Sequence, residues 1–521
     1  MYPGIQAQKH PDRPAVIMAS SGEQITYREL DRRSNQLAHF LRQQGLKRLD
    51  HFSMFMENHA RFVEVCAAGE RTGAYYTCIN SFLTAEELAY ILQNSESQVL
   101  VTTAALAEVA WAALPSCPQL RCCLVIDGPD TPRQVAHVQV QDYAQAVGSL
   151  PTTPVADESL GTAMLYSSGT TGRPKGILRP LPEQPPAQHL PLYEFLFGLW
   201  HYRDDMVYLS PAPLYHSAPQ AAVGLTIRKG GTAIIMEKFD PLRYLELVET
   251  HQVSHTQLVP TMFTRMLKMP ESDRQRFDTS SLEIAVHAAA PCPATIKEQM
   301  IDWWGPIIHE YYGATEGLGF TACDTPQWQA HRGSVGKVLF GELHILDEAM
   351  QPCEQGTSGQ IWFKTATEFS YFNDPEKTAE VTSPDGSMTT VGDVGYIDED
   401  GFLYLTDRAT FMIISGGVNI YPQETENLLI THPDVEDAAV FGVPNEEMGE
   451  EVKAVVQLLP GRAKTAEMVE RLMAYCREHL SHVKCPRTID FDDALPRLPT
   501  GKLYKRVLRD RYWAEHKNRI V

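Results

Sequence analysis

The sequence predicts an α/β protein with a large N-terminal domain and a smaller C-terminal domain, and three observations support this prediction. The chain has 521 residues, more than a single hydrophobic core usually serves. Short apolar segments such as QVLVTT, CCLVID and TAIIM alternate with helical segments, which is typical of layered sheets with largely parallel strands. The composition changes near residue 390, and a compact α/β pattern restarts after residue 408.

The clearest predicted helix covers residues 24–45. Thr26 is a candidate N-cap, Glu29 stands three residues later at capping-box spacing, and Gly45 ends the apolar repeat. Further along, a helix over 241–252 is followed by the strand-like segment SHTQLVP and a second helix, TMFTRMLKM. These segments repeat the strand–helix alternation through the first domain.

A β-hairpin is predicted in GDVGYIDEDGFLYLTDR, with the pair Asp400–Gly401 as its turn. Beyond it, helices are predicted in IYPQETENLLITHP and AEMVERLMAYCREHL, with strands in DAAVFGVP and VKAVVQLLP between them. We therefore predict a boundary at 409–411, which divides the chain into domains 1–408 and 409–521.

Composition limits the function classes. With 43% hydrophobic and 21% charged residues the chain is not largely disordered, and a net charge of −20 argues against a general nucleic-acid binder. The ten cysteines show neither a CxxC pair nor zinc spacing, which suits a reducing cytoplasm. The N-terminus lacks the apolar core of a signal peptide, and no apolar run is long enough to span a bilayer.

The segment YSSGTTGRPKG at 166–176 is the strongest functional motif. Glycines let backbone N–H groups turn towards an anion, hydroxyl groups donate to phosphate oxygens, and two cations balance the charge. Its spacing differs from that of a Walker A loop. The candidate phosphate-binding residues are Ser167, Ser168, Gly169, Thr170, Thr171, Gly172 and Lys175.

This segment resembles the signature of the ANL superfamily of adenylate-forming enzymes, which includes acyl-CoA synthetases, peptide-synthetase adenylation domains and beetle luciferases. Four further segments match the superfamily in order along the chain: YYGATEG (311–317), GDVGYIDEDGFLYLTDR (392–408), ISGGVNIYPQE (414–424) and LPRLPTGKLYKRVLR (495–509). The segment FMIISGGVNIYPQE is most similar to bacterial acyl-CoA synthetases that activate fatty acids and steroid acids. The resemblance implies a large N-terminal domain and a small, mobile α+β lid.

The resemblance also assigns roles to nucleotide-binding residues. Thr315 would bind the α-phosphate, and Glu316 would help to hold Mg²⁺, a cation that prefers oxygen ligands. Asp393 would hold the ribose hydroxyls, with Arg408 near the same sugar. The surface against which adenine lies is matched by Ala289, Ala290, Pro291, Tyr312 and Gly313.

Lys502 in PTGK is the candidate catalytic residue of the adenylation step. This step brings a carboxylate onto the α-phosphorus, and an ammonium group that bridges the two anions stabilises the transition state. In the superfamily the lid then rotates, and Gly416 and Gly417 would leave room for the pantetheine arm of CoA. His216 in APLYHSAP resembles the position that borders the acyl pocket and thiol entry. The hinge, usually Asp or Lys, is Thr410 here.

The sequence therefore predicts a carboxylic acid:CoA ligase that uses ATP, Mg²⁺ and coenzyme A and forms an acyl-AMP intermediate. A mostly apolar set of pocket candidates favours a medium- or long-chain or polycyclic acid: Trp200, His216, Ala218, Val223, His287 and Phe320. The alternatives are an adenylating enzyme with a carrier-protein or other non-CoA acceptor, luciferase-like oxidation, a nucleotide sensor without catalysis, and adenylation of a different oxyanion. We expect no nucleic-acid partner, and a homodimer is left open.

Overall fold

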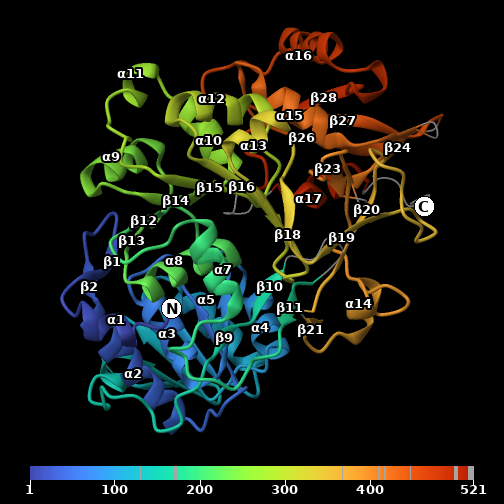
Figure 1. Cartoon of the computed structure of the whole chain (residues 1–521). Coiled ribbons are helices and arrows are strands. Elements are labelled where there is room, and N and C mark those ends of the chain that lie inside the picture. Colours follow the sequence, from blue (N-terminus) through green and yellow to red (C-terminus); the bar gives the residue numbers. More distant parts are fainter. Residues whose placement is uncertain are drawn as a thin grey trace. The chain divides into compact units, whose positions relative to one another are not determined.

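The computed structural model of the chain describes residues 1–128, 131–167, 173–366, 368–408, 411–415, 418–445, 447–497 and 503–513 (Figure 1). The chain forms two compact units. The first contains residues 1–258, 270–285 and 367–378, and the second contains residues 259–269, 286–366 and 379–521. The division into domains 1–408 and 409–521 stays a prediction.

The first unit contains two sheets of mainly parallel strands, as the strand–helix alternation predicts. One sheet has the order β7-β8-β6-β5-β3-β4-β9, and the other contains β14-β12-β13-β1-β2. Strands β3 to β6 are buried along their whole length, which is typical of parallel strands with both faces covered. The strands are β1 Pro14–Met18, β2 Gln24–Thr26, β3 His51–Phe55, β4 Tyr75–Ile79, β5 Val99–Thr103, β6 Cys122–Ile126, β7 Arg133–Val135, β8 Val138–Asp142, β9 Thr162–Ala163, β12 Val207–Ser210, β13 Thr232–Ile235 and β14 His255–Leu258.

The predicted capping box of the first long helix is confirmed. Helix α2 (Tyr27–Gln43) begins after Thr26, whose side chain accepts from the Glu29 N–H while the Glu29 carboxylate accepts from the Thr26 N–H. Residues 24–26, predicted as helix, instead form β2, which pairs antiparallel with β1. The remaining helices of this unit are α1 Gly4–Lys9, α3 Arg61–Thr72, α4 Ala85–Asn94, α5 Ala107–Ala113, α6 Tyr143–Val147, α7 Pro191–Leu199, α8 Ser217–Lys229, α9 Pro241–His251 and α11 Glu271–Arg274.

The second unit contains mainly antiparallel sheets. Strands β16, β17 and β18 pair in that order, β19-β20-β22-β23 form a second sheet, and β25-β24-β27-β26 form a third, with β28 parallel to β27. The strands are β15 Ile284–His287 (which begins in the first unit), β16 Ile308–Gly313, β17 Phe320–Cys323, β18 Lys337–Phe340, β19 Glu342–Leu346, β20 Gly359–Lys364, β22 Asp393–Ile397, β23 Leu403–Arg408, β24 Ile413–Ser415, β25 Val418–Ile420, β26 Val435–Asn445, β27 Gly449–Leu458 and β28 Thr488–Asp492.

The C-terminal part of this unit has the predicted α+β pattern. Helices α15 (Pro422–Thr431), α16 (Ala466–His479) and α17 (Lys505–Trp513) accompany the third sheet at the orange-to-red end of the chain (Figure 1). The helices α10 (Pro260–Leu267), α12 (Ala294–Trp304) and α13 (Thr325–Ala330) belong to the earlier part, and α14 covers Pro375–Glu380. The predicted hairpin is confirmed as β22–β23, although its turn extends from Asp398 to Gly401.

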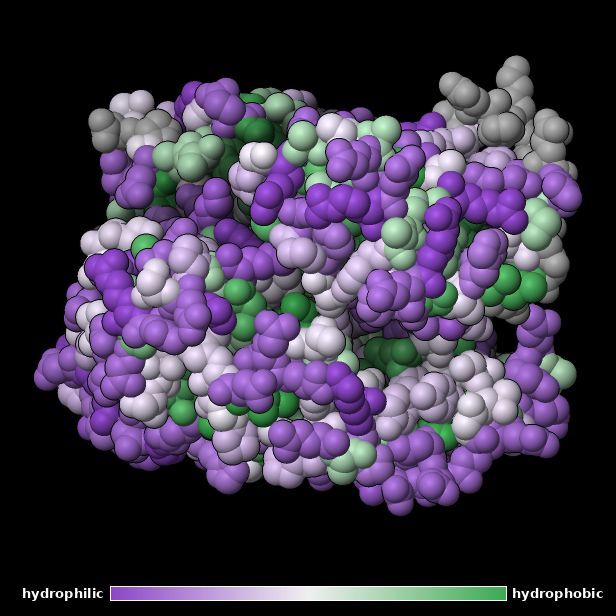
Figure 2. Space-filling view, turned by 90° about the horizontal axis from the view of Figure 1, so that it is seen from above, coloured by the Kyte–Doolittle hydropathy of each residue, from purple (hydrophilic) through white to green (hydrophobic). Residues whose placement is uncertain are grey.

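The surface is consistent with the ordinary proportion of hydrophobic residues in the sequence. Hydrophilic side chains predominate on the face shown in Figure 2, and hydrophobic ones form small separate groups. Among the described helices, none is long and apolar enough to cross a membrane. The ten cysteines are free thiols, and all except Cys292 and Cys353 are buried.

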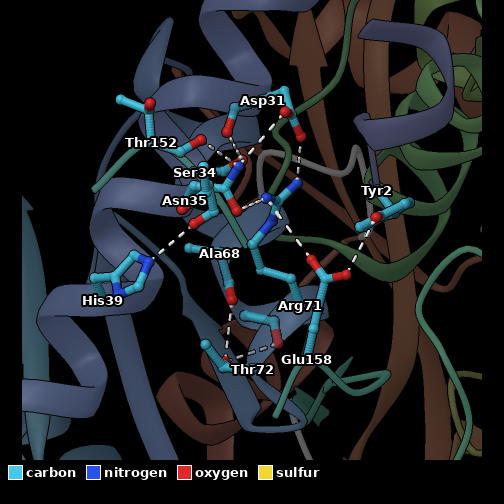
Figure 3. Close-up of polar contacts among 12 residues, drawn as sticks. Tyr2, Asp31, Ser34, Asn35, His39, Ala68, Arg71, Thr72, Thr152 and Glu158 are labelled. Atoms are coloured by element: carbon cyan, nitrogen blue, oxygen red, sulfur yellow. Dashed lines mark hydrogen bonds and ion pairs between the residues drawn. The ribbon is translucent and has the colours of Figure 1, made fainter. Parts of the chain in front are cut away.

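A buried polar network stabilises the first unit (Figure 3). The Arg71 guanidinium on α3 is completely buried, pairs with the Asp31 carboxylate on α2 at 2.7 Å and donates to the Asn35 side chain. It also lies 3.8 Å from the carboxylate of Glu158, which accepts a hydrogen bond from the Tyr2 hydroxyl. A charge that leaves water must be paired, so this network fixes α2, α3 and the segment before β9 against one another.

We predict that Arg71→Met lowers the free energy of unfolding by about 3 kcal/mol, because it leaves the half-buried carboxylates of Asp31 and Glu158 without their cation. Chemical denaturation would measure the loss. Arg28, whose pair with Asp12 is exposed, provides the matched control, and Arg28→Met should change stability by less than about 1 kcal/mol. Equal losses in the two variants would contradict a special role for the buried network.

Candidate active site

Asp393 is a carboxylate in a fixed orientation. It is the first residue of β22, and its side chain accepts a 2.8 Å hydrogen bond from the Tyr312 hydroxyl near the end of β16. The Tyr312 ring stacks on Phe363 of β20, with 6.4 Å between ring centroids. The hydrogen bond and the stacked ring hold this carboxylate in place, and its oxygens can accept hydrogen bonds from neighbouring hydroxyl groups, as a ribose would require.

The backbone of Arg408 lies beside Asp393. The two residues are direct partners in the antiparallel β22–β23 ladder. This register brings together two residues that the sequence assigns to the same sugar, although the structure describes only the backbone of Arg408.

Thr315 and Glu316 lie in a tight turn directly after β16. The Gly317 N–H donates to the Ala314 carbonyl at 2.9 Å, and Gly317 has a φ of 76°, a conformation that glycine adopts without steric cost. Glu316 is buried and Thr315 is half-buried. The glycine that ends YYGATEG is therefore required by the turn that positions both side chains.

The alanine run lies in the loop after the neighbouring strand. It follows β15, which is adjacent to β16 in the sheet and is connected to it through α12, the type of crossover that parallel strands use. Ala289 has a φ of 74°, which costs a residue with a side chain about 1–2 kcal/mol. Ala289 and Pro291 are exposed and Ala290 is half-buried. In open α/β sheets, ligands bind at the carboxyl ends of the strands. The alanine run and the Thr315–Glu316 turn both lie at such ends.

A buried charged cluster supports these two loops. Lys297 of α12 places its ammonium 2.6 Å from the carboxylate of Glu310 on β16 and 4.7 Å from the centre of the Trp328 ring. The His287 ring at the end of β15 lies 3.4 Å from the same carboxylate and packs edge-on against Phe263. This cluster was not predicted from the sequence, because its members come from separate elements and follow no recognisable spacing.

Burial governs the protonation of the cluster. Burial, reinforced by the neighbouring Lys297, holds the pKa of His287 well below its ordinary value, so its imidazole is neutral near pH 7. Burial also raises the pKa of Glu310, while Lys297 opposes that rise. Lys297 and Glu310 therefore act as a structural ion pair between α12 and β16.

In the first unit, a hairpin surrounds the predicted phosphate-binding segment. Ser167 at the end of β10 (Leu165–Ser167) is the direct partner of Lys175 at the start of β11 (Lys175–Leu178). The Lys175 ammonium lies 4.6 Å from the centre of the Tyr371 ring on β21 (Ser370–Tyr371). The pairing fixes both ends of the segment. Ser168, Gly169, Thr170, Thr171 and Gly172 themselves lie outside the described residues.

His216 stands at the N-terminus of α8, half-buried, with its ring centre 4.2 Å from that of Tyr215. Of the other pocket candidates, Val223 and His287 are completely buried. The predicted Lys502, Thr410, Gly416 and Gly417 lie outside the described residues.

Within the described ranges, no group of three or more His, Cys, Asp or Glu residues could hold a metal ion. Mg²⁺ in nucleotide-binding enzymes commonly uses one or two carboxylates and completes its shell with phosphate oxygens and water. The single buried carboxylate of Glu316 fits that mode of binding.

Comparison with known proteins gives matches along nearly the whole chain. A family model described as AMP-binding enzyme matches residues 5–370, and the model of the AMP-binding enzyme C-terminal domain matches residues 424–502. A feruloyl-CoA synthase from Amycolatopsis sp. is 33% identical over 98% of both chains. A medium/long-chain-fatty-acid–CoA ligase from Mycobacterium tuberculosis is 29% identical over 97% of this chain and 88% of its own. The solved structure of an amide bond synthetase from Marinactinospora thermotolerans superimposes with a TM-score of 0.80 and 25% identity, covering 98% of this chain and 99% of its own.

We predict that Lys297→Met lowers the free energy of unfolding by about 3–5 kcal/mol, because Glu310 would then lie buried without its cation. Denaturation measurements should also show that Lys297→Met combined with Glu310→Leu recovers most of the loss, since neither charge then remains. The neighbouring Glu298 on the same helix forms an exposed pair with Arg332, and Glu298→Gln should cost less than about 1 kcal/mol. If the double variant were as unstable as Lys297→Met alone, the loss could not come from an unpaired Glu310 carboxylate.

Proposed function

Because the chain belongs to the AMP-binding enzyme family, we propose that it joins an apolar carboxylic acid to coenzyme A at the expense of ATP. It is an AMP-forming enzyme of the acid–thiol ligase family. The observation that carries the proposal is the match along nearly the whole chain to relatives named as CoA ligases, together with a fixed carboxylate, Asp393, in the motif assigned to ribose.

The reaction has two steps. In the first, a carboxylate oxygen of the acid attacks the α-phosphorus of ATP, the bond to the β-phosphate oxygen breaks, and pyrophosphate leaves. In the second, the thiolate sulfur of CoA attacks the carbonyl carbon of the acyl-AMP, and AMP leaves with the bonding electron pair. Both steps bring an anion towards a phosphorylated group, so fixed positive charge and hydrogen-bond donors lower the barriers.

Different residues of the chain bind the parts of ATP and stabilise the transition state. Asp393, oriented by Tyr312, holds the ribose hydroxyls, and the loops after β15 and β16 bind adenine and the α-phosphate. The hairpin that carries Ser167 and Lys175 holds the terminal phosphates. Glu316 would hold Mg²⁺, which supplies neutralisation of phosphate charge when bound. Lys502 stabilises the adenylation transition state through its charge.

The acid and the acceptor are the finer parts of the proposal. We favour a medium- or long-chain or polycyclic acid, because the pocket candidates are mainly apolar, and the feruloyl-CoA synthase adds hydroxycinnamic acids to the classes worth testing. An acceptor other than CoA is the second candidate, which the similar amide bond synthetase favours. We place the reaction in the cytoplasm, and the free thiols support this.

We predict that ATP and a suitable acid yield pyrophosphate and AMP, because adenylation cleaves between the α- and β-phosphates. A panel of lauric acid, palmitic acid, a steroid side-chain acid, ferulic acid and acetate should be compared with and without CoA and Mg²⁺, with nucleotides separated by chromatography. Release of ADP and phosphate would contradict the adenylate mechanism. If turnover continued undiminished after removal of Mg²⁺, the reaction would not require the metal.

We predict that Lys502→Ala lowers adenylation at least about 100-fold and leaves thioester formation from supplied acyl-AMP within about threefold of the parent rate. The reason is that the lysine charge acts on the phosphate only in the first step. Pyrophosphate release and acyl-CoA formation measure the two steps separately. Equal loss in both steps would show that Lys502 serves folding rather than adenylation.

A further inference from the structure

The hairpin of the first unit carries two cations, Arg173 immediately before β11 and Lys175 at its start. Strand β11 pairs with β10 on one side and with β21 on the other (Figure 1). Each cation lies over a tyrosine ring: the Arg173 guanidinium carbon is 4.9 Å from the centre of the Tyr90 ring, and the Lys175 ammonium is 4.6 Å from that of the Tyr371 ring. In the described part of the chain, neither cation pairs with a carboxylate. Their charges are therefore left for an anion from outside the chain.

The Tyr371 ring is a fixed surface. Its side chain is buried, and its ring packs edge-on against Phe369, with 5.5 Å between the ring centroids. The Tyr371 N–H donates to the Thr378 hydroxyl at 3.0 Å, which ties β21 to the following helix, α14. Tyr371 is the direct partner of Ile177, so Lys175, two residues earlier on the same face of β11, is its diagonal neighbour. The register of the two strands thus brings the ammonium to the ring.

Helix α4 holds the hairpin itself. Tyr90 and Asn94 are four residues apart on this helix and therefore on one face of it. The Tyr90 hydroxyl donates at 3.2 Å to the carbonyl of Pro174, the residue between the two cations. The Asn94 side chain accepts a 2.6 Å hydrogen bond from the Tyr166 hydroxyl on β10. The Tyr166 ring lies over its direct partner Gly176, where a Cβ would come within 3.0 Å of the ring, so this packing requires the last glycine of the motif.

We propose that Tyr90 and Tyr371 are positioning residues, whose rings hold the two cations in place for the terminal phosphates of ATP. This role rests on the proposed function, in which the hairpin holds those phosphates. A carboxylate partner would cancel the positive charge and would have to be displaced before a phosphate could bind. An aromatic ring attracts the cation through its quadrupole and leaves the net charge unchanged. The cations are thus ordered before ATP arrives, which reduces the entropy lost on binding.

ATP–pyrophosphate exchange with the best acid of the panel tests the ring beside Lys175. Tyr371→Leu should raise the KM for ATP and for pyrophosphate at least about fivefold and leave kcat within about twofold, because the ring supports binding in the ground and transition states alike. Tyr371→Phe, which keeps the aromatic face, should stay within about twofold of the parent. Thioester formation from supplied acyl-AMP should be unchanged in both variants, since that intermediate has lost the terminal phosphates. Trp111→Leu is the matched control, because it removes the ring over which Arg133 lies elsewhere in the same unit, and both KM values should equal those of the parent.

Two variants separate the ring of Tyr90 from its hydroxyl. Tyr90→Leu should raise the same two KM values about threefold, a smaller effect because Arg173 is exposed. Tyr90→Phe loses only the hydrogen bond to Pro174 and should change the KM values less than Tyr90→Leu does.

A double-mutant cycle separates positioning from general stability. In a Lys175→Met background, Tyr371→Leu should raise the KM for ATP by less than about a further twofold, since the ring acts through the absent ammonium. A further rise of about fivefold there, an effect of Tyr371→Phe as large as that of Tyr371→Leu, or a parallel loss of thioester formation overturns the role of the ring. If Lys175→Met itself leaves both KM values unchanged, the hairpin does not hold the phosphates, and its proposed function fails first. If Tyr371→Leu does not fold, Tyr90→Leu in the parent and in an Arg173→Met background decides by the same criteria.

Discussion

Among the described residues, each buried lysine or arginine has a carboxylate partner from a different secondary-structure element, and much of the fold depends on that requirement. A buried charge without a partner costs several kcal/mol of folding free energy. The element that carries the partner must therefore lie in a fixed position against the element that carries the cation. Arg71 meets Asp31 on another helix, Lys297 meets Glu310 on a strand, and Lys505 meets Glu426 on a helix earlier in the chain. Such pairs add little net stability, yet they determine which element lies against which.

These ion pairs matter for function because they connect the helices and strands that carry the motif loops, although their residues are not part of the motifs. Lys297 and Glu310 connect α12 to β16, and the loops that leave β15 and β16 carry the alanine run and the Thr315–Glu316 turn. Strain at Ala289 is tolerated because the strand and helix around it are fixed. In the C-terminal part, Lys505 and Glu426 connect α17 to α15.

Local signals made much of the fold predictable. The Thr26 and Glu29 capping box, the hairpin around Gly401, and the helices of the C-terminal part depend on residues close together in sequence. Residues 24–26 were the exception, because pairing with β1 outweighed the helical pattern that follows them. The family was also predictable, since five motifs occur in order along the chain. A short motif contains, within a few residues, the residue types that its chemistry needs.

The sequence by itself determined the superfamily, the α/β class and the residue types that the chemistry needs, because periodicity, caps and motifs are local properties of the chain. Only the tertiary structure showed that the Tyr312 hydroxyl orients Asp393, that Lys297 and Glu310 lie together under the nucleotide motifs, and that the Tyr371 ring lies beside the Lys175 ammonium. These contacts join residues separated in sequence by intervals that follow no period. Their formation depends on which elements pack together, and that is decided by the packing of the whole core.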